Sequence, residues 1–328
     1  MSTPITAFAD LIAPIRPETF FSDSWEIRPL HIRRSDSRYY DALLTNGDVE
    51  AAISSGGLRY PAIQLAKGGA FYPPEVFTRN IRSGNDVFGG VPDLDRISAE
   101  YKAGATITLP AFHRAWRPLG TLASAVEDYF DHAVHTNVYI TPGNTNGFSP
   151  HYDTHEVFVL QIAGNKHWKV YEPPLALPHR SEPFRSHGYE LPPVLLEVDL
   201  AAGDILYLPR GFVHTTLTVD SFSVHVTLGI TVYTWMDLVG ELIQSRMDDL
   251  RLRRALPPGF ASREYLKSNL EREFSEIIAE LQKAANCQKL VNSFSYRVRL
   301  GRPGRSGIGG EFRSNVTATG LRAPPKIL

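Results

Sequence analysis

The spacing of apolar residues changes from mainly strand-like to helix-like near residue 234, and this change predicts how the chain is organised. Between residues 105 and 231 most apolar stretches are short, rich in β-branched residues and separated by Gly, Pro and Asn, which is typical of strands, while residues 119–130 alone have helical spacing. From Trp235 the apolar residues recur every three or four positions, as they do on one face of a helix. We therefore expect a mainly β domain over residues 1–234, followed by a helical module over residues 235–290.

Weaker patterns in the first domain predict helices and strands that decorate the β core. Residues 30–34 and 58–65 have the alternation or β-rich composition of strands. Residues 48–55 predict a short helix with Asp48 as its cap. Residues 66–95 contain repeated Pro and Gly turns, and we expect a long irregular excursion there.

Bulk composition excludes several classes of protein. The chain has 328 residues and a net charge of −1, so we expect no general attraction to nucleic acid or to anionic membranes. Its single cysteine, Cys287, excludes an intramolecular disulfide. Residues 1–20 lack the apolar stretch of a signal peptide, and no apolar run approaches membrane-spanning length. We expect a cytoplasmic protein that does not associate with a membrane.

The last part of the chain has a different composition. Residues 291–328 hold six Arg and one Lys against one Glu, together with six Gly and three Pro. This composition predicts a basic, poorly packed tail. Direct binding to nucleic acid is expected only as a weak contribution of this tail.

Three polar residues in the β domain predict a metal site. His151 and Asp153 are two positions apart, so on an extended segment their side chains share a face. His214 follows a short apolar strand and a Pro-Arg-Gly turn. Two imidazoles and one carboxylate occupy one face of an Fe(II) octahedron and leave three positions open. His155 also falls on the ligand face by spacing, but we prefer His214, because such a triad in a barrel is completed from another strand.

The residues after this motif predict a hairpin. Two β-rich runs, 156–162 and 166–171, flank Ala-Gly-Asn. The hairpin would return Lys166 toward His151.

The residues around the motif resemble those of a known family. The resemblance is carried by the run Pro150-His-Tyr-Asp153, by Phe158-Val-Leu-Gln161, by Gly164, Lys166 and Trp168, and by the stretch 203–229. These features are similar to those of JmjC-type cupins, and most of all to their ribosomal oxygenase branch. The resemblance implies a mainly β fold with α-helices, built on a double-stranded β-helix (cupin/JmjC jelly-roll) barrel.

The resemblance also implies cofactors and site residues. Fe(II) would be bound by His151, Asp153 and His214, which would form the catalytic centre, and 2-oxoglutarate would be the cosubstrate. Lys166 would bind the distal carboxylate of 2-oxoglutarate, since family members carry Lys or Arg at the matching position. Two residues of one strand face would line the cosubstrate and substrate pocket, namely Asn137 and Tyr139.

Two departures from the family, and one shared feature, affect these expectations. Relatives often have Ser where this chain has Gly229, so we expect one hydroxyl hydrogen bond to the cosubstrate to be missing or replaced. The basic tail stands where ribosomal oxygenases have a winged-helix domain. The shared feature is the helical module over residues 235–290, for which the resemblance implies a homodimer. The alternative is that the apolar stripes of these helices pack on the barrel.

The function that these features imply is hydroxylation of a side chain in a protein or peptide, at the β-carbon of a His or Arg. One alternative is a tailoring hydroxylase of a ribosomally made peptide natural product. Another is a metal-dependent cupin isomerase or dioxygenase without a cosubstrate, which Lys166 argues against. A third, from a different class, is a non-catalytic JmjC-like binding module, which the complete triad argues against.

Overall fold

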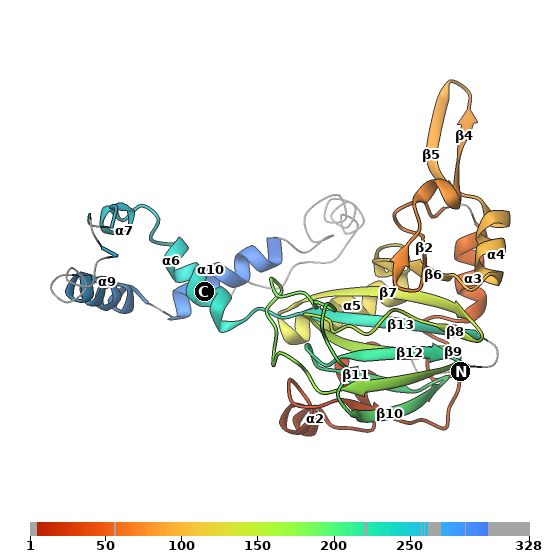
Figure 1. Cartoon of the computed structure of the whole chain (residues 1–328), viewed down its shortest axis with the longest axis horizontal. Helices are drawn as coiled ribbons and strands as arrows, with labels where there is room; N and C mark the ends of the chain where they lie inside the picture. Colours follow the sequence, from red (N-terminus) through yellow and green to blue (C-terminus); the bar gives the residue numbers. More distant parts are fainter. Residues whose placement is uncertain are drawn as a thin grey trace, which may run out of the picture. The chain divides into compact units, whose positions relative to one another are not determined.

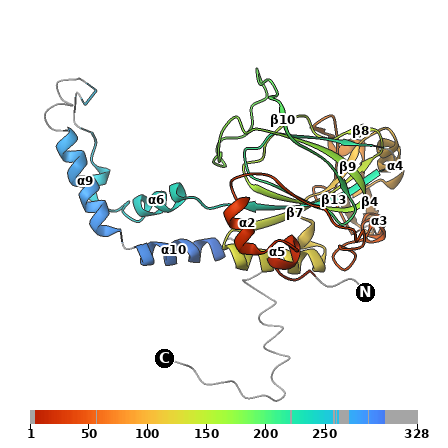
Figure 2. The same ribbon diagram turned by 90° about the horizontal axis from the view of Figure 1, so that it is seen from below.

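The computed structural model describes residues 5–55, 57–219, 222–256, 258, 260–261, 270–285 and 287–300. It consists of two compact units, Met1–Val232 and Tyr233–Leu328, which are described separately (Figures 1 and 2). The helices and strands before the barrel are α1 (Phe8–Ile12), α2 (Pro17–Asp23), β1 (Leu30–Ile32), α3 (Asn46–Ser54), β2 (Gln64–Lys67), β3 (Ala70–Phe71), the 3-10 turn η1 (Pro74–Val76), β4 (Thr78–Ser83), β5 (Asp86–Pro92) and α4 (Leu94–Lys102).

The remaining elements of the first unit form or cover the barrel: β6 (Thr106–Leu109), η2 (Phe112–Arg114), α5 (Arg117–Phe130), β7 (Ala133–Pro142), β8 (Thr145–Asn146), β9 (Glu156–Tyr171), β10 (Val194–Ala201), β11 (Ile205–Leu208), β12 (His214–Thr218) and β13 (Phe222–Thr231). All of their described pairings are antiparallel, and β9 is the strand that most others meet. The first half of β9 pairs with β11 and β13, and its second half pairs with β10 and β12.

The predicted hairpin at residues 163–165 is wrong, because β9 runs through this point as one strand. Gly164 has a φ of 65°, and a Cβ there would collide with the carbonyl oxygen of Phe222. The register with β13 shifts at Val224/His225, opposite the same point. The glycine therefore bends the strand past its neighbour, and the chain passes from one set of partners to the next without reversing.

The main hydrophobic core lies between the barrel and the N-terminal helices. Aromatic rings dominate its outer part: Phe8 of α1 lies 5.5 Å from the ring centroid of Phe20 and 5.9 Å from that of Phe158. All three side chains are almost inaccessible to solvent. The barrel strands alternate in burial where one face meets this core, as along β7. A second cluster, centred on Trp168 and Val170 of β9, fills the space between β9, β10 and β11.

The structure corrects three of the predictions for the N-terminal region. The cap of α3 is Thr45, while Asp48 closes the capping box three residues later. The strand expected from residue 58 begins only at Gln64. Residues 66–95 contain an antiparallel hairpin, β4–β5, which projects from the first unit in Figure 1, and are therefore not wholly irregular.

The second unit is helical. Its described elements are α6 (Trp235–Gln244), α7 (Leu250–Arg253), α9 (Glu271–Ala284) and α10 (Cys287–Leu300). Because α10 contains residues 291–300, the tail expected from residue 291 is wrong for that part, and residues 301–328 lie outside the described residues. No helix in the described part of the chain is long and apolar enough to cross a membrane.

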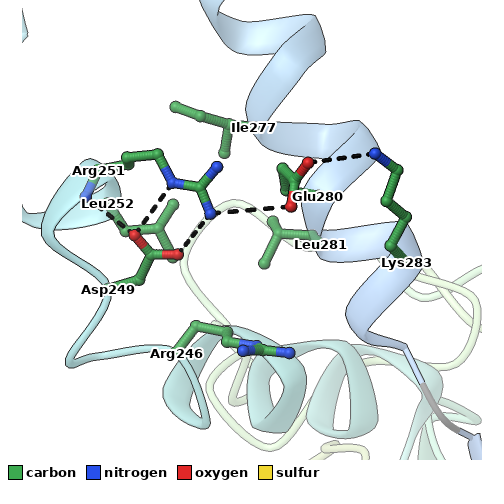
Figure 3. Close-up of a pocket in the computed structure, with 8 residues that line it drawn as sticks. All are labelled: Arg246, Asp249, Arg251, Leu252, Ile277, Glu280, Leu281 and Lys283. Atoms are coloured by element: carbon green, nitrogen blue, oxygen red, sulfur yellow. Dashed lines mark hydrogen bonds and ion pairs between the residues drawn. The ribbon is translucent and has the colours of Figure 1, made fainter.

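A surface pocket of about 250 Å³ lies within the helical unit (Figure 3). Four of its charged side chains form one set of ion pairs: Arg251 contacts both Asp249 and Glu280, and Glu280 also contacts Lys283. Arg246 lines the pocket as well. The described residues of this pocket include no group of potential metal ligands like the one in the first unit.

The bend in β9 leads to a stability prediction. Gly164→Ala should lower the free energy of unfolding by about 3 kcal/mol or more, because it combines left-handed backbone strain with a collision at Phe222. The matched control is Gly84→Ala, at a φ of 60° with no atom near the added methyl group, which should lower it by about 1–2 kcal/mol. Urea denaturation measures both values, and equal losses would contradict the packing argument.

Candidate active site

Backbone hydrogen bonds join the two segments that carry the triad. His214 donates its backbone N–H to the carbonyl oxygen of His151 at 2.9 Å, and these two residues form an isolated antiparallel bridge. Gly211 donates to the carbonyl oxygen of Asp153 at 3.0 Å, in a turn where its φ is 93°. The segment after β8 and the turn before β12 are thus fixed to each other at the position of each expected ligand.

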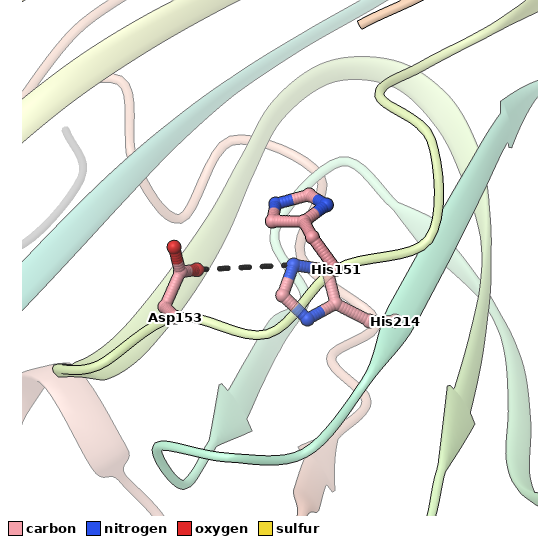
Figure 4. Close-up of side chains that lie close together, drawn as sticks. All are labelled: His151, Asp153 and His214. Atoms are coloured by element: carbon pink, nitrogen blue, oxygen red, sulfur yellow. Dashed lines mark ion pairs between the residues drawn. The ribbon is translucent and has the colours of Figure 1, made fainter. Parts of the chain in front are cut away.

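The side chains of His151, Asp153 and His214 come together at this junction (Figure 4). One potential ligand atom from each lies within 4.8 Å of the others, and Nε2 of His214 is 3.8 Å from Oδ2 of Asp153. Ligand atoms held by one octahedral ion at right angles are about 3 Å apart, so small side-chain adjustments would suffice. The donor set and its spacing therefore fit a metal ion.

Second hydrogen bonds orient the two imidazoles. Nδ1 of His151 lies 2.8 Å from the carbonyl oxygen of Ser149, and Nδ1 of His214 lies 3.1 Å from that of Phe212. A carbonyl can only accept, so each Nδ1 must carry the proton. The lone pair of each ring is then on Nε2, as a metal ligand requires.

The charges at the triad suit a cation. Burial and then the neighbouring His151 lower the pKa of His214 to about 4, so its ring is neutral at pH 7. Burial alone would raise the pKa of Asp153, but the nearby rings of His155, His214 and His151 outweigh it and lower that pKa. Neutral imidazoles and an ionised carboxylate are the forms that bind metal.

A buried ion cluster anchors the turn that leads to His214. Arg210, which is 5% exposed, pairs with Glu26 and also with the fully buried Glu156 at 2.8 Å. The hydroxyl of Tyr207 donates to the other carboxylate oxygen of Glu156, and burial raises the pKa of Glu156 to about 7. The cluster ties the segment before β1 to the start of β9 and to the turn after β11.

A cavity of about 140 Å³ opens beside the triad. Its wall includes all the site residues expected from the sequence and several others: Thr106, Asn137, Tyr139, Gly147, Phe148, His151, Asp153, His155, Val157, Lys166, Trp168, His214, Thr215, Thr216, His225 and Thr227. An apolar cavity of similar size, about 150 Å³, accommodates a six-carbon ring, so a small organic acid bound partly to the metal is of suitable size.

Lys166 is a buried cation in this wall. It is 4% exposed, and its Nζ donates to Oγ1 of Thr141 at 3.2 Å. Among the described residues no carboxylate pairs with it, and burial lowers its pKa to about 7. A buried ammonium without an anion is unfavourable, so binding of an anionic ligand would stabilise the charged form of Lys166. This fits a carboxylate of 2-oxoglutarate.

Asn137 and Tyr139 lie on β7 and form part of a hydrogen-bonded row. The side-chain oxygen of Asn137 accepts from the backbone N–H of Ala111 at 3.1 Å. The Tyr139 side chain hydrogen-bonds to those of Asn137 and Thr227, and burial raises its pKa to about 12. Its ring stacks on His225 with centroids 4.9 Å apart. These contacts fix the two side chains where they face the cavity.

Several wall residues were given no role from the sequence. Trp168 and His225 each contribute a buried polar atom without a described partner, the indole Nε1 and Nδ1 respectively. The sequence predicts His225 as a buried residue near the site that is not a ligand, and the structure places it there, but the hydrogen bond expected for it is absent at Nδ1 among the described residues. Trp168 belonged to the family-like run, whereas Thr106 and Phe148 carried no signal, because only the packing of β6 and the loop after β8 brings them to the wall. Gly229 faces the rings of His135 and His155 and is not part of the wall.

Comparison with known proteins establishes the family. The sequence matches the JmjC domain family over residues 111–238. The chain is a JmjC-domain protein. Its relatives include ribosomal oxygenase 1 of Gallus gallus, 33% identical over 76% of this chain and 42% of the relative. Ribosomal oxygenase 2 of Mus musculus is 31% identical over 78% of this chain and 55% of that protein.

This JmjC-domain protein has the expected fold. It resembles the structure of YcfD, a ribosomal oxygenase from Escherichia coli in complex with cobalt and 2-oxoglutarate. The TM-score is 0.51 at 14% identity, over 85% of this chain and 69% of the other. The predicted relationship to ribosomal oxygenases and the cupin-type barrel are confirmed. The chain spans about half the length of the curated relatives it matches.

The triad geometry predicts the result of ligand removal. His214→Ala should lower the affinity for Co(II), used as a stable substitute for Fe(II), by at least about a hundredfold, since even residues that support a ligand contribute ten- to a hundredfold. Equilibrium dialysis measures this without any assay of activity. His167→Ala, at a surface histidine of the same barrel, is the control and should leave the affinity unchanged. Loss of affinity in His155→Ala but not in His214→Ala would contradict the assignment.

The lowered pKa of Lys166 predicts a pH dependence of cosubstrate binding. Above pH 7 the unliganded protein loses the ammonium proton, and an arriving carboxylate must restore it. The affinity of the cobalt-loaded protein for 2-oxoglutarate should therefore weaken up to about tenfold per pH unit above 7. Titration calorimetry from pH 6 to 9 tests this. In Lys166→Arg, whose side chain keeps its charge, the affinity should stay constant, and a parallel decline would assign the effect to the metal site.

Proposed function

We propose that this protein is an Fe(II)- and 2-oxoglutarate-dependent oxygenase that hydroxylates a side chain of a protein or peptide. The observation that carries the proposal is the buried amino group of Lys166, which has no carboxylate partner among the described residues and lies in the same cavity wall as a two-histidine, one-carboxylate set. A metal site alone would suit many reactions. A metal site in the same cavity as Lys166 suits a cosubstrate that chelates the metal at one end and presents a carboxylate to the lysine at the other.

Each part of the wall would have a distinct task. His151, Asp153 and His214 would hold the iron, which together with 2-oxoglutarate supplies the oxidising power to insert oxygen into a C–H bond. Lys166 would orient the cosubstrate through its distal carboxylate. Asn137 and Tyr139, fixed by their hydrogen bonds to each other, would line the cosubstrate and substrate part of the cavity. The buried surroundings would limit water at the reacting centre.

The proposed substrate is a polypeptide, with hydroxylation at the β-carbon of a His or Arg. Support comes from two relatives that are named ribosomal oxygenases. It also comes from a relative of Culex quinquefasciatus that is named a bifunctional lysine-specific demethylase and histidyl-hydroxylase. Because the chain spans only about half of these proteins, a ribosomal protein as substrate is part of the proposal.

We also propose that the protein forms a homodimer through residues 235–290. In α6, Met236, Val239 and Ile243 are 71%, 55% and 46% exposed, and they follow one another at helical spacing. Such an exposed apolar stripe is unfavourable in water and is typical of an interface.

The decisive experiment is mass spectrometry of ribosomal proteins from the native host, with and without the gene. The expected result is one additional oxygen on a single His or Arg that depends on the gene and is restored by the wild type but not by His214→Ala. An unmodified ribosome together with a gene-dependent oxygen on a short peptide encoded nearby would favour the tailoring hydroxylase. Absence of 2-oxoglutarate turnover with iron would instead favour either a cupin enzyme without a cosubstrate or a binding module.

A further inference from the structure

The segment that carries two of the three triad residues has a single buried side chain. Residues 147–155 connect β8 to β9 outside the barrel strands, and all of them are described. Within this segment only Tyr152, between His151 and Asp153, is buried, with 8% of its surface exposed. A buried side chain loses packing contacts when its backbone shifts. Tyr152 is therefore the side-chain anchor of the segment.

Tyr152 points away from the cavity. Neighbouring residues of an extended segment point to opposite faces, and the triad residues on either side of Tyr152 line the cavity whereas Tyr152 does not. The same holds for His214, which lines the cavity, and Val213, which does not. Tyr152 and Val213 instead form a small hydrophobic cluster with Tyr171, separate from the two larger clusters. This cluster is the reverse side of the metal site.

A loop closes the cluster. Residues 172–193, here called the Pro-rich loop, connect β9 to β10 without a helix or strand. Its Phe184 meets the ring of Tyr152 edge-on, with centroids 5.1 Å apart, and the ring of Tyr189 covers Phe184 at 5.2 Å. The hydroxyl of Tyr152 donates to the carbonyl oxygen of Glu182 at 2.9 Å. The anchor of the ligand segment thus packs on the loop and not on the main core.

The acceptor of this hydrogen bond belongs to a closed turn. The backbone N–H of Glu182 donates to the carbonyl oxygen of His179 at 2.8 Å. In return the N–H of His179 donates to the carboxylate of Glu182 at 2.9 Å, and its ring contacts the hydroxyl of Ser181. These bonds fix the carbonyl group that receives the hydroxyl of Tyr152.

The Pro-rich loop also packs against the turn before His214. Gly211, which donates to the carbonyl oxygen of Asp153, has no room for a side chain. A Cβ there would lie 2.7 Å from the carbonyl oxygen of Leu175 and 2.8 Å from Cδ of Pro178. The loop therefore contacts both segments that carry the triad, one through its first residues and the other through its aromatic residues.

We propose that the Pro-rich loop is a positioning element of the metal site, and that Phe184 acts through Tyr152 on the two ligands that flank it. This inference rests on the proposed function, which includes the metal. The potential ligand atoms lie within 4.8 Å of one another and must come closer around an ion. A segment held from its reverse side needs only small adjustments, whereas a segment free to shift loses metal affinity to the ordering of its ligands.

The first test removes the ring that covers Tyr152. In the full-length protein, Phe184→Ala should lower the affinity for Co(II), measured by equilibrium dialysis, by at least about tenfold, as loss of a residue that supports a ligand does. Phe184→Leu, which keeps most of the apolar volume, should recover most of the affinity. An unchanged affinity in Phe184→Ala would overturn the inference.

The control is a partly buried phenylalanine of the main core. Phe130 meets the ring of Phe8 edge-on at 4.7 Å, a contact like that of Phe184 with Tyr152. Phe130→Ala should lower the melting temperature at least as much as Phe184→Ala and leave the Co(II) affinity unchanged. An equal loss of affinity in the two variants would assign the effect to general destabilisation and overturn the inference.

A second test compares two hydroxyl groups of the same cluster. Tyr152→Phe removes only the hydroxyl that donates to Glu182 and should lower the Co(II) affinity about three- to tenfold, as for one lost hydrogen bond. Tyr189→Phe removes a buried hydroxyl that has no partner among the described residues, and it should leave the affinity unchanged. Equal affinities would overturn the role of the Tyr152 hydrogen bond. This pair keeps both rings and tests the inference even if Phe184→Ala does not fold.

The visible absorption of bound Co(II) reports the arrangement of its ligands. At saturating Co(II), Phe184→Ala should give a spectrum different from that of the wild type, whereas Phe130→Ala should give the wild-type spectrum. A less stable protein with an intact site would keep the wild-type spectrum, so an unchanged spectrum and affinity in Phe184→Ala would reject the inference and leave the proposed function standing. A wild type that binds Co(II) but never turns over 2-oxoglutarate would reject the proposed function alone. A wild type that binds no Co(II) would reject both.

Discussion

The candidate site depends on a few backbone hydrogen bonds between two segments that are far apart in sequence. The bridge between His151 and His214, and the bond from Gly211 to Asp153, set the separation of three side chains before any ligand is present. Backbone groups have little freedom once both ends are paired, so side chains attached to them start near their working positions. The metal would then contribute its binding energy to holding the ion and would not have to assemble the site.

Burial disfavours the protonated form of two basic groups in the wall. The same loss of water lowers the pKa of His214 to about 4 and that of Lys166 to about 7. For His214 the result is a neutral imidazole, the form that binds metal. For Lys166 the charged form is left only marginally stable near pH 7, so an anionic ligand would be needed to restore it.

Sequence patterns predicted those features that depend on neighbours in the chain, and missed those that depend on distant contacts. The spacing of His151 and Asp153 and the apolar strand before His214 are local patterns, and together with the family resemblance they predicted three residues whose side chains lie close together in the structure. The hairpin at Gly164 was wrong, since the approach of Phe222 to that glycine is visible only when β9 and β13 are paired.

The same distinction applies to single residues near the site and to the helical unit. Gly229 was noticed as unusual, but its effect on His135 and His155 required the register of three strands. Composition suggested a loose tail from residue 291, whereas the structure continues α10 to Leu300, because the high glycine content begins only after the helix.

The ion cluster around Arg210 shows where the folding unit begins. The JmjC match starts at residue 111, yet Glu26 pairs with the arginine of the turn before His214, and β1 adds a strand to β11. A fragment cut at the boundaries of the match would expose the edge of β11 and leave Arg210 and Glu156 without their third member. The domain recognised by sequence therefore covers only part of the compact unit Met1–Val232, and the N-terminal hundred residues are a structural part of the unit that carries the candidate site.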